Sequence, residues 1–173
     1  MVDSWFARTD AVLLGRTTYD IFAGCWPEVT DPDNLIATTL NNTQKYVVST
    51  TLDEAPWNNS TVISADVVEA VGELKSKPGG ELQIHGSCAL GRSLHDAGLI
   101  DEYRLIVFPV VVGTGKKLFA DGCVPLSLPP GRVVRHVGGR RGLHVAPDGR
   151  AGGWADVRAG RRQRGRARRP VIS

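Results

Sequence analysis

The stretch DAVLLGRTTYDIF at residues 10–22 decides the fold class of this chain. Its apolar run at residues 11–14 has no polar alternation, which is typical of a strand buried on both faces of a parallel sheet. Gly15 ends that run, and the apolar side chains that follow have helical spacing as far as Gly24. A buried strand that turns directly into a short helix predicts the first half of a strand–helix–strand unit.

The same alternation continues as far as residue 113. The patterns predict further strands and helices. The strands are expected at residues 45–50 (KYVVST), 61–64 (TVIS), 81–86 (ELQIHG) and 101–113 (DEYRLIVFPVVVG). The helices are expected at residues 65–75 and after Ser87. Ser87 is expected to cap the second of these helices. The last strand is apolar on both faces and is therefore expected in the middle of a sheet. The sequence predicts an α/β fold, a mostly parallel sheet flanked by helices.

Length and composition indicate one globular domain. The chain has 173 residues, of which 42% are hydrophobic and 23% charged, as is ordinary for a protein with a core of its own. No signal peptide or membrane-spanning run is recognised, so a cytoplasmic location is expected. Cys25, Cys88 and Cys123 are odd in number and far apart, which favours buried free thiols over a disulfide framework, and no metal site is expected.

The charge changes sign near Pro129 and Pro130. Residues 1–130 carry 9 Lys and Arg against 16 Asp and Glu, whereas residues 131–173 carry 12 Arg, no Lys and only two Asp. The second part is rich in glycine and lacks sustained periodicity, so it is expected to be disordered. We therefore divide the chain into a domain at residues 1–128 and a basic tail at residues 129–173.

Two interpretations of the tail are open. An arm that binds nucleic acid is one, because arginine neutralises phosphates. The other is GC-rich coding DNA read out of frame, which yields Arg, Gly, Ala and Pro but no Lys. The lack of Lys, the single Trp154 and the acidic first part favour the second interpretation, so no specific nucleic-acid partner is expected.

Two strand–helix junctions have the composition of an anion site. In LLGRTT, Gly15 allows close approach to the backbone, Arg16 supplies a charge, and Thr17 and Thr18 add hydroxyl groups. In IHGSCALG, Gly86 and Ser87 open the next such helix. Neither the P-loop pattern nor GxGxxG is present.

Four blocks in this order resemble the dihydrofolate reductase-like proteins, in the branch of the C-terminal reductase domain of the bacterial bifunctional riboflavin deaminase-reductase. The blocks are residues 10–22, 45–52 (KYVVSTTL), 79–94 (GGELQIHGSCALGRSL) and 99–119 (LIDEYRLIVFPVVVGTGKKLF). The resemblance implies an NADPH-dependent reductase of a pyrimidine- or pterin-like small molecule, related to 5-amino-6-(5-phosphoribosylamino)uracil reductase of riboflavin biosynthesis. It also implies a homodimer.

The resemblance implies a cofactor site as well. Residues Gly15, Arg16, Thr17 and Thr18 would hold one part of the diphosphate, and Gly86 with Ser87 the other. Ser49 and Thr50 would meet the adenosine ribose and its 2′-phosphate. The family loop at this place carries an Arg, whereas STTL has only hydroxyls, which weakens the expected preference for NADPH over NADH.

Catalytic residues are not identified. The family's helical carboxylate falls at Val2, and Asp3 would point about 100° away from that position. Trp5 and Phe6 are expected to pack in the core, and His85 is expected to be a packed residue rather than a catalyst.

Two departures from the family pattern leave an alternative open. The family's first strand, which forms a wall of its active site, has no counterpart before Met1, and its final pair of edge strands has no counterpart after residue 128. The chain is therefore either an active reductase or an inactive, truncated or frame-shifted remnant of one.

Overall fold

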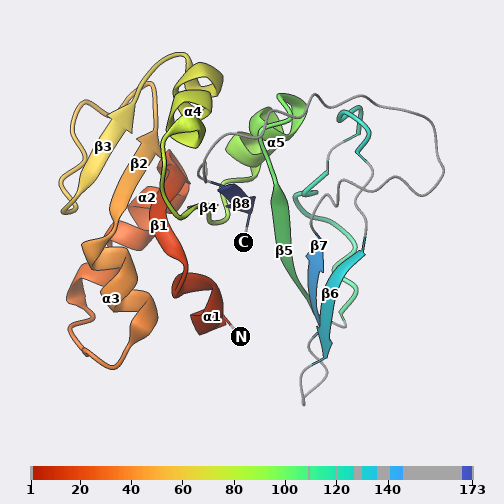
Figure 1. The fold of residues 1–173 in the computed structure, drawn as a ribbon, viewed down its shortest axis with the longest axis horizontal. Coiled ribbons are helices and arrows are strands. Elements are labelled where there is room, and N and C mark those ends of the chain that lie inside the picture. Colours follow the sequence, from red (N-terminus) through yellow and green to blue (C-terminus); the bar gives the residue numbers. More distant parts are fainter. Residues whose placement is uncertain are drawn as a thin grey trace.

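The protein has an α/β fold built on one eight-stranded sheet (Figure 1). The computed structural model describes residues 2–108, 110–119, 121–126, 130–135, 141–145 and 169–172. The strand order is β3-β2-β1-β4-β8-β5-β7-β6, with the strands β1 (Thr9–Gly15), β2 (Gln44–Val48), β3 (Ser60–Ile63), β4 (Glu81–Ile84), β5 (Glu102–Val107), β6 (Pro130–Arg135), β7 (Arg141–Val145) and β8 (Arg169–Ile172). Pairing is parallel from β3 to β5 and antiparallel at β5–β7 and β7–β6. The predicted mostly parallel sheet is confirmed.

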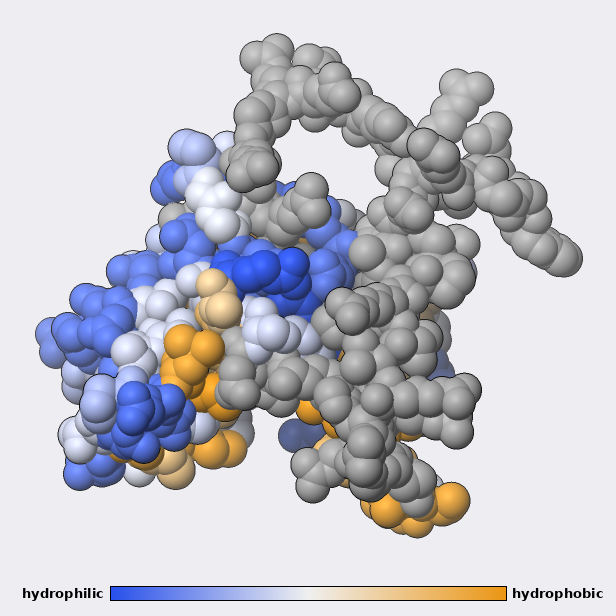
Figure 2. Space-filling model, turned by 60° about the horizontal axis from the view of Figure 1, so that its bottom comes forward, coloured by the Kyte–Doolittle hydropathy of each residue, from blue (hydrophilic) through white to orange (hydrophobic). Residues whose placement is uncertain are grey.

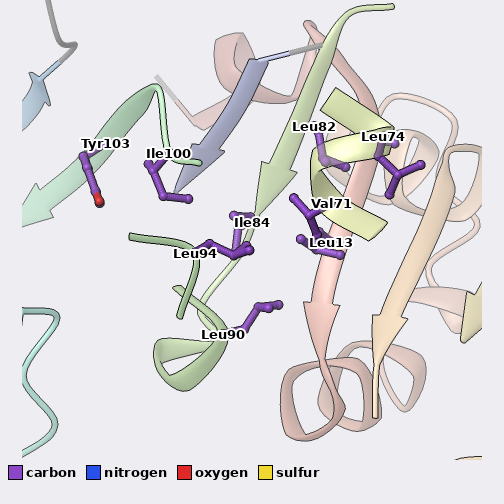
Figure 3. Close-up of a cluster of buried hydrophobic side chains, with 10 residues drawn as sticks. Leu13, Val71, Leu74, Leu82, Ile84, Leu90, Leu94, Ile100 and Tyr103 are labelled. Atoms are coloured by element: carbon purple, nitrogen blue, oxygen red, sulfur yellow. The ribbon is translucent and has the colours of Figure 1, made fainter. Parts of the chain in front are cut away.

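Helices cover both faces of the sheet. They are α1 (Val2–Phe6), α2 (Arg16–Ala23), a 3₁₀ turn η1 (Trp26–Glu28), α3 (Leu35–Asn42), α4 (Val67–Ser76) and α5 (Cys88–Asp96). Side chains of α4 and α5 pack on one face with Leu13 and Ile84, as the close-up in Figure 3 shows. Side chains of α1, α2 and α3 pack on the other face with Val12 and Leu14. The run at residues 11–14 is fully buried because alternate side chains enter two different cores.

The core on the α1, α2 and α3 side contains two polar anchors. The Tyr19 hydroxyl accepts a hydrogen bond of 2.9 Å from the Trp57 N–H. The buried Lys45 ammonium donates to the carbonyls of Leu40 and Thr43, both at 2.8 Å, and lies 4.5 Å from the Trp57 ring centroid. These contacts fix the end of α3 against the start of β2, because the cation sits beside carbonyls that the helix leaves unpaired. Burial lowers the pKa of Lys45 to about 8.

β8 occupies a central position in the sheet, although the described elements begin with α1 and no strand precedes it, as expected. Arg169–Ile172 lies between β4 and β5 and runs parallel to both (Figure 1). β6 and β7 form an antiparallel pair at the edge beside β5, which corrects the expectation that the closing strands are absent. Three segments of residues 129–173 are therefore strands, while the rest of these residues lies outside the described residues. That residues 129–173 form a disordered tail stays a prediction. That the tail was read out of frame stays a prediction.

The predicted strand at residues 101–113 is too long. β5 ends at Val107, and Val110, Val111 and Val112 are exposed by 67%, 100% and 77%. The apolar pattern led to the wrong boundary because it cannot show where neighbouring strands stop. Apolar surface is also visible in Figure 2, where it is gathered in a few patches of the face shown.

Candidate functional site

Three parallel strands end at the same edge of the sheet and bring the predicted site residues there. β1 pairs with β2 on one side and with β4 on the other, all parallel. Gly15, Ser49 and Gly86 lie at or just beyond the carboxyl ends of these strands. This is the edge at which open α/β sheets bind ligands. The order of elements along the chain, rather than any single motif, gathers these residues.

The two predicted glycine junctions touch each other. The Gly15 N–H donates to Ser87 Oγ at 2.8 Å, and Thr18 Oγ1 accepts from the Ser87 N–H at 3.2 Å and from the Ser87 hydroxyl at 3.1 Å. An added Cβ at Gly86 would lie 3.3 Å from Thr18 Oγ1. Gly86 has φ +56°, a conformation that glycine adopts without steric cost. Glycine is therefore favoured at this contact both by its backbone angle and by the close approach.

Ser87 does not have the predicted capping role. Its φ is +52°, its side chain makes no capping hydrogen bond to α5, and its hydroxyl instead connects the two junctions. Gly15, the corresponding residue of α2, has no side chain with which to cap. Two helices thus begin side by side with no side-chain cap, and their first N–H groups are suited to an anion.

Arg16 is placed at this edge but is already paired. Its Nε lies 2.7 and 2.8 Å from the two carboxylate oxygens of Asp20, one turn along α2. Both side chains are more than 40% exposed, so the pair is weak and an anion can compete for the guanidinium. Thr17 is exposed.

Ser49 and Thr50 differ in what they offer. Ser49 is buried, and its Oγ accepts the N–H groups of Thr51 at 3.2 Å and Leu52 at 3.1 Å, so that the hydroxyl holds the loop after β2 in shape. Thr50 is exposed. Sequence reasoning gave both residues the same role because it could not show which hydroxyl is used within the loop.

His85 lies just before the second junction. Its ring stacks on Phe6 with centroids 4.8 Å apart and planes at 5°, and Phe22 lies at 6.4 Å. The expected packing of His85, and of Trp5 and Phe6 in the core, is confirmed. Burial, together with the charge of Arg104, lowers the pKa of His85 to about 4. The imidazole is therefore neutral at pH 7, and its Nε2 has no hydrogen-bond partner among the described residues.

A buried ion pair on the α1 side of the sheet was not predicted. The fully buried Arg104 of β5 donates two hydrogen bonds, of 2.7 and 2.8 Å, to the carboxylate of Glu81 on β4 and another, of 2.7 Å, to Glu102. Burial alone would raise the pKa of Glu81, but hydrogen bonds from Arg104 and Gln83 and the charges of Arg104 and Arg8 lower it. The charged residues Glu81 in ELQ and Glu102 and Arg104 in DEYR were the available signal, since charges at strand positions expected to be buried need partners.

The remaining predictions concern Asp3, metal and membrane. The side chain of Asp3 lies outside the described residues. In the part of the chain that the structure describes, no group of three or more His, Cys, Asp or Glu is placed to hold a metal ion. The three cysteines are free thiols, but Cys25 is exposed and Cys88 and Cys123 are only partly buried, so the expected burial is wrong. None of the helices described is long and apolar enough to cross a bilayer.

The order and direction of the strands and the helices on both faces define an α/β protein with dihydrofolate reductase-like architecture. A family model described as the RibD C-terminal domain matches residues 1–130. The chain belongs to the RibD C-terminal domain family. The resemblance inferred from the four sequence blocks is thus confirmed.

Individual relatives agree with this assignment. The uncharacterized protein YyaP of Bacillus subtilis (strain 168) is 35% identical over 116 residues, which cover 66% of this chain and 61% of the relative. YwjB, uncharacterized and from the same strain, is 26% identical over 117 residues, which cover 68% of this chain and 62% of the relative. The chain thus spans about three fifths of the length of these relatives.

A solved structure supports the fold. A crystal structure of a Shewanella sp. PV-4 protein, whose name assigns it provisionally to riboflavin biosynthesis, matches with a TM-score of 0.66 at 21% identity. The match covers 83% of this chain and 76% of that one. At this identity the likeness shows a shared fold, and the activity of either protein is a separate question.

Proposed function

We propose that this chain is an NADPH-dependent reductase of a pyrimidine- or pterin-like small molecule. The RibD C-terminal domain family is a reductase family. The observation that carries the proposal is the 2.8 Å hydrogen bond between Gly15 and Ser87, which joins two helix N-termini at the carboxyl edge. A diphosphate is the part of NADPH that such paired N-termini suit, because it spreads its charge over two adjacent groups.

The residues at this edge fit the diphosphate of a dinucleotide better than they fit the 2′-phosphate of NADPH. The uncapped starts of α2 and α5 suit the diphosphate. The loop after β2 has no cation at residues 49–52 for the 2′-phosphate, so NADH is expected to compete with NADPH. Bound NADPH would supply a hydride to the substrate.

The protein's own groups restrict where a proton can come from. Glu81 is held in its charged form by Arg104, and His85 is neutral at pH 7. Neither group is therefore the proton source at neutral pH, because a general acid needs a pKa near the working pH. The neutral His85 instead offers a hydrogen bond in a fixed orientation, held by its stacking on Phe6.

The first experiment is titration of the full chain with NADPH and NADH, followed by nucleotide fluorescence. Gly86→Ala is expected to weaken NADPH binding about tenfold, because its Cβ would press on Thr18 at the contact between the junctions. Gly98→Ala is the matched control: Gly98 has φ +67°, lies just after α5 and has open space around it. No fluorescence change at millimolar NADPH with the unaltered chain would reject the proposal.

A second experiment uses the competition for Arg16. Asp20→Asn frees the guanidinium and is expected to tighten NADPH binding about twofold to threefold, whereas Arg16→Gln is expected to weaken it by a similar factor. Lys117 and Asp121 form another exposed pair, also four residues apart in the sequence, so Asp121→Asn is the control. Equal effects of Asp20→Asn and Asp121→Asn would show that Arg16 does not meet the phosphates.

A further inference from the structure

β8 separates two strands that are consecutive in the sequence. β4 and β5 are connected through α5, yet β8 stands between them. It pairs with β4 from Glu81↔Arg169 to Ile84↔Ile172, and with β5 at Glu102↔Val171 and Tyr103↔Ile172. No pairing of β4 with β5 is found in the described part of the chain. The sheet is therefore continuous only while β8 is in place.

We propose that the space between β4 and β5, here called the strand slot, is a docking site for an extended segment with an apolar anchor, whose occupant is the chain's own Arg169–Ile172. Addition of a strand to exposed strand edges uses main-chain hydrogen bonds for affinity and alternate side chains for specificity. Both walls of the slot run parallel to the docked strand. The slot thus fits a short peptide of one direction and one register.

Val171 is the anchor of the docked strand. Its side chain is fully buried, and its register partners are Gln83 on β4 and Glu102 on β5. Gln83 is held in place because its Nε2 donates to the Trp5 carbonyl and to Glu81, both at 2.8 Å. A side chain that is fully enclosed among fixed neighbours gives an apolar anchor of defined size.

The walls of the slot are also joined by a contact in which β8 takes no part. The Glu81–Arg104 ion pair connects β4 to β5 with two hydrogen bonds, although these strands are not neighbours in the sheet. Arg104 is further fixed by Glu102. A slot whose walls are already held together loses less freedom when the strand enters, which favours docking of a short segment.

Docking also reaches the candidate site. Ile172 pairs with Ile84, which is two residues before Gly86, so the carboxyl end of β8 lies at the edge where the glycine junctions meet. If the proposed function holds, docking of β8 and binding of NADPH stabilise each other, because coupling between two sites is reciprocal. This coupling rests on the proposed function, whereas the docking itself does not.

The test uses the full chain with Val171→Asp, which places a charge in the enclosed position. We expect faster hydrogen exchange at the amides of Leu82–Ile84 and Tyr103, by about tenfold or more, and a Tm lower by about 5 °C or more. The control is Val111→Asp, a substitution of the same kind at a fully exposed residue, which is expected to change neither. If Val171→Asp does not fold, Val171→Ala gives the same exchange test with a smaller effect. Unchanged exchange in both variants would overturn the proposal.

Rescue in trans separates docking from a general loss of stability. A synthetic peptide with the sequence RRPVIS (residues 168–173), added to the Val171→Asp or Val171→Ala chain, is expected to restore slow exchange at Leu82–Ile84. The same peptide with Asp in place of Val is the control and is expected to restore nothing. Failure of the native peptide to rescue either variant would overturn the slot as a docking site.

Dilution distinguishes the chain's own strand from that of a second copy. For the unaltered chain, the rate of amide hydrogen exchange at Leu82–Ile84 is expected to be independent of protein concentration. Light scattering measures the molecular mass at each concentration and so shows whether a dimer is present. Protection that is lost as a dimer dissociates would overturn the intrachain occupant. NADPH is expected to slow this exchange further. If NADPH binds but does not slow the exchange, the coupling is overturned. If NADPH does not bind at all, the proposed function is rejected, and the peptide rescue still tests docking.

Discussion

β1 and the segment after β5 are both apolar runs, yet they have opposite surroundings. Residues 11–14 of β1 are fully buried, whereas Val110, Val111 and Val112 are mostly or fully exposed. β1 has a parallel strand on either side and helices on both faces, while no strand pairing is described for residues 110–112. An apolar run becomes a fully buried strand only where it has a strand on either side and helices on both faces. The sequence shows the apolar run but not these neighbouring elements.

The largest effect is expected in β1 itself. Leu13→Ala would remove a fully buried side chain that packs between α4 and α5, and should lower the free energy of unfolding by about 4 kcal/mol. Denaturant unfolding followed by circular dichroism measures this. A loss below about 1 kcal/mol would mean that the β1 core is loosely packed and would remove the contrast between the two runs.

The second largest effect is expected at the buried Glu81–Arg104 ion pair, which joins β4 to β5. Arg104→Met would leave the Glu81 carboxylate buried, with Gln83 and the partly exposed Arg8 as its partners among the described residues, and we expect a loss of about 3 kcal/mol. Lys117→Met breaks an exposed pair beyond β5 and should cost less than about 0.5 kcal/mol. Adding Glu81→Gln to Arg104→Met should recover part of the loss. Equal costs for the two single variants would show that burial does not distinguish these pairs.

Acid should lower the free energy of unfolding through His85, which lies just after β4, the neighbour of β1 in the sheet. In the native protein the pKa of His85 is about 4, against an ordinary value of 6.5. As the pH falls from 6.5 to 4 the unfolded chain binds a proton that the native ring does not, so stability should fall by somewhat under 3 kcal/mol. His85→Phe keeps a ring against Phe6 and should lack this component. Parallel stability curves for the two proteins between pH 4 and 6.5 would contradict the lowered pKa.

The smallest effect is expected after β5. Val111→Ser changes a fully exposed side chain and should alter the free energy of unfolding by less than about 0.5 kcal/mol. The melting temperatures of Val111→Ser and Leu13→Ala, measured side by side, compare the exposed run with the buried one. A loss of 2 kcal/mol or more would show that residues 110–112 are covered in solution, as a second copy or another partner would cover them.

Most elements before residue 108 were predictable because each carries its own periodicity. β1, α2, α4 and α5 lie within a residue or two of their expected positions. α3 was missed although Asn34, whose side chain accepts the Ala37 N–H, gives a capping signal. The signal is weak because LIATTLNN mixes β-branched residues and asparagines, which favour helices poorly. The strands after residue 129 were not predictable, because their order in the sheet depends on partners far away in the sequence.

The candidate site was predictable in its parts but not in its contacts. Gly15 and Gly86 were identified from their places after buried strands, and parallel pairing of β1 with β4 brings them together. The role of Ser87 was predicted wrongly, since a serine before a helix ordinarily caps it, and here its hydroxyl binds Gly15 instead. The Glu81–Arg104 pair joins residues 23 positions apart, and no local pattern specifies such a pair.

The position of β8 bears on the order of events during synthesis. All other described elements leave the ribosome before Arg169–Ile172 does, yet this strand sits inside the sheet. The nascent chain can assemble the β3-β2-β1-β4 unit early, but main-chain pairing of β5 with this unit requires the strand β8, which is made last of the described elements. Such late, long-range closure is expected to make folding slow, and to expose the edges of β4 and β5 to chaperones or to other chains until it occurs.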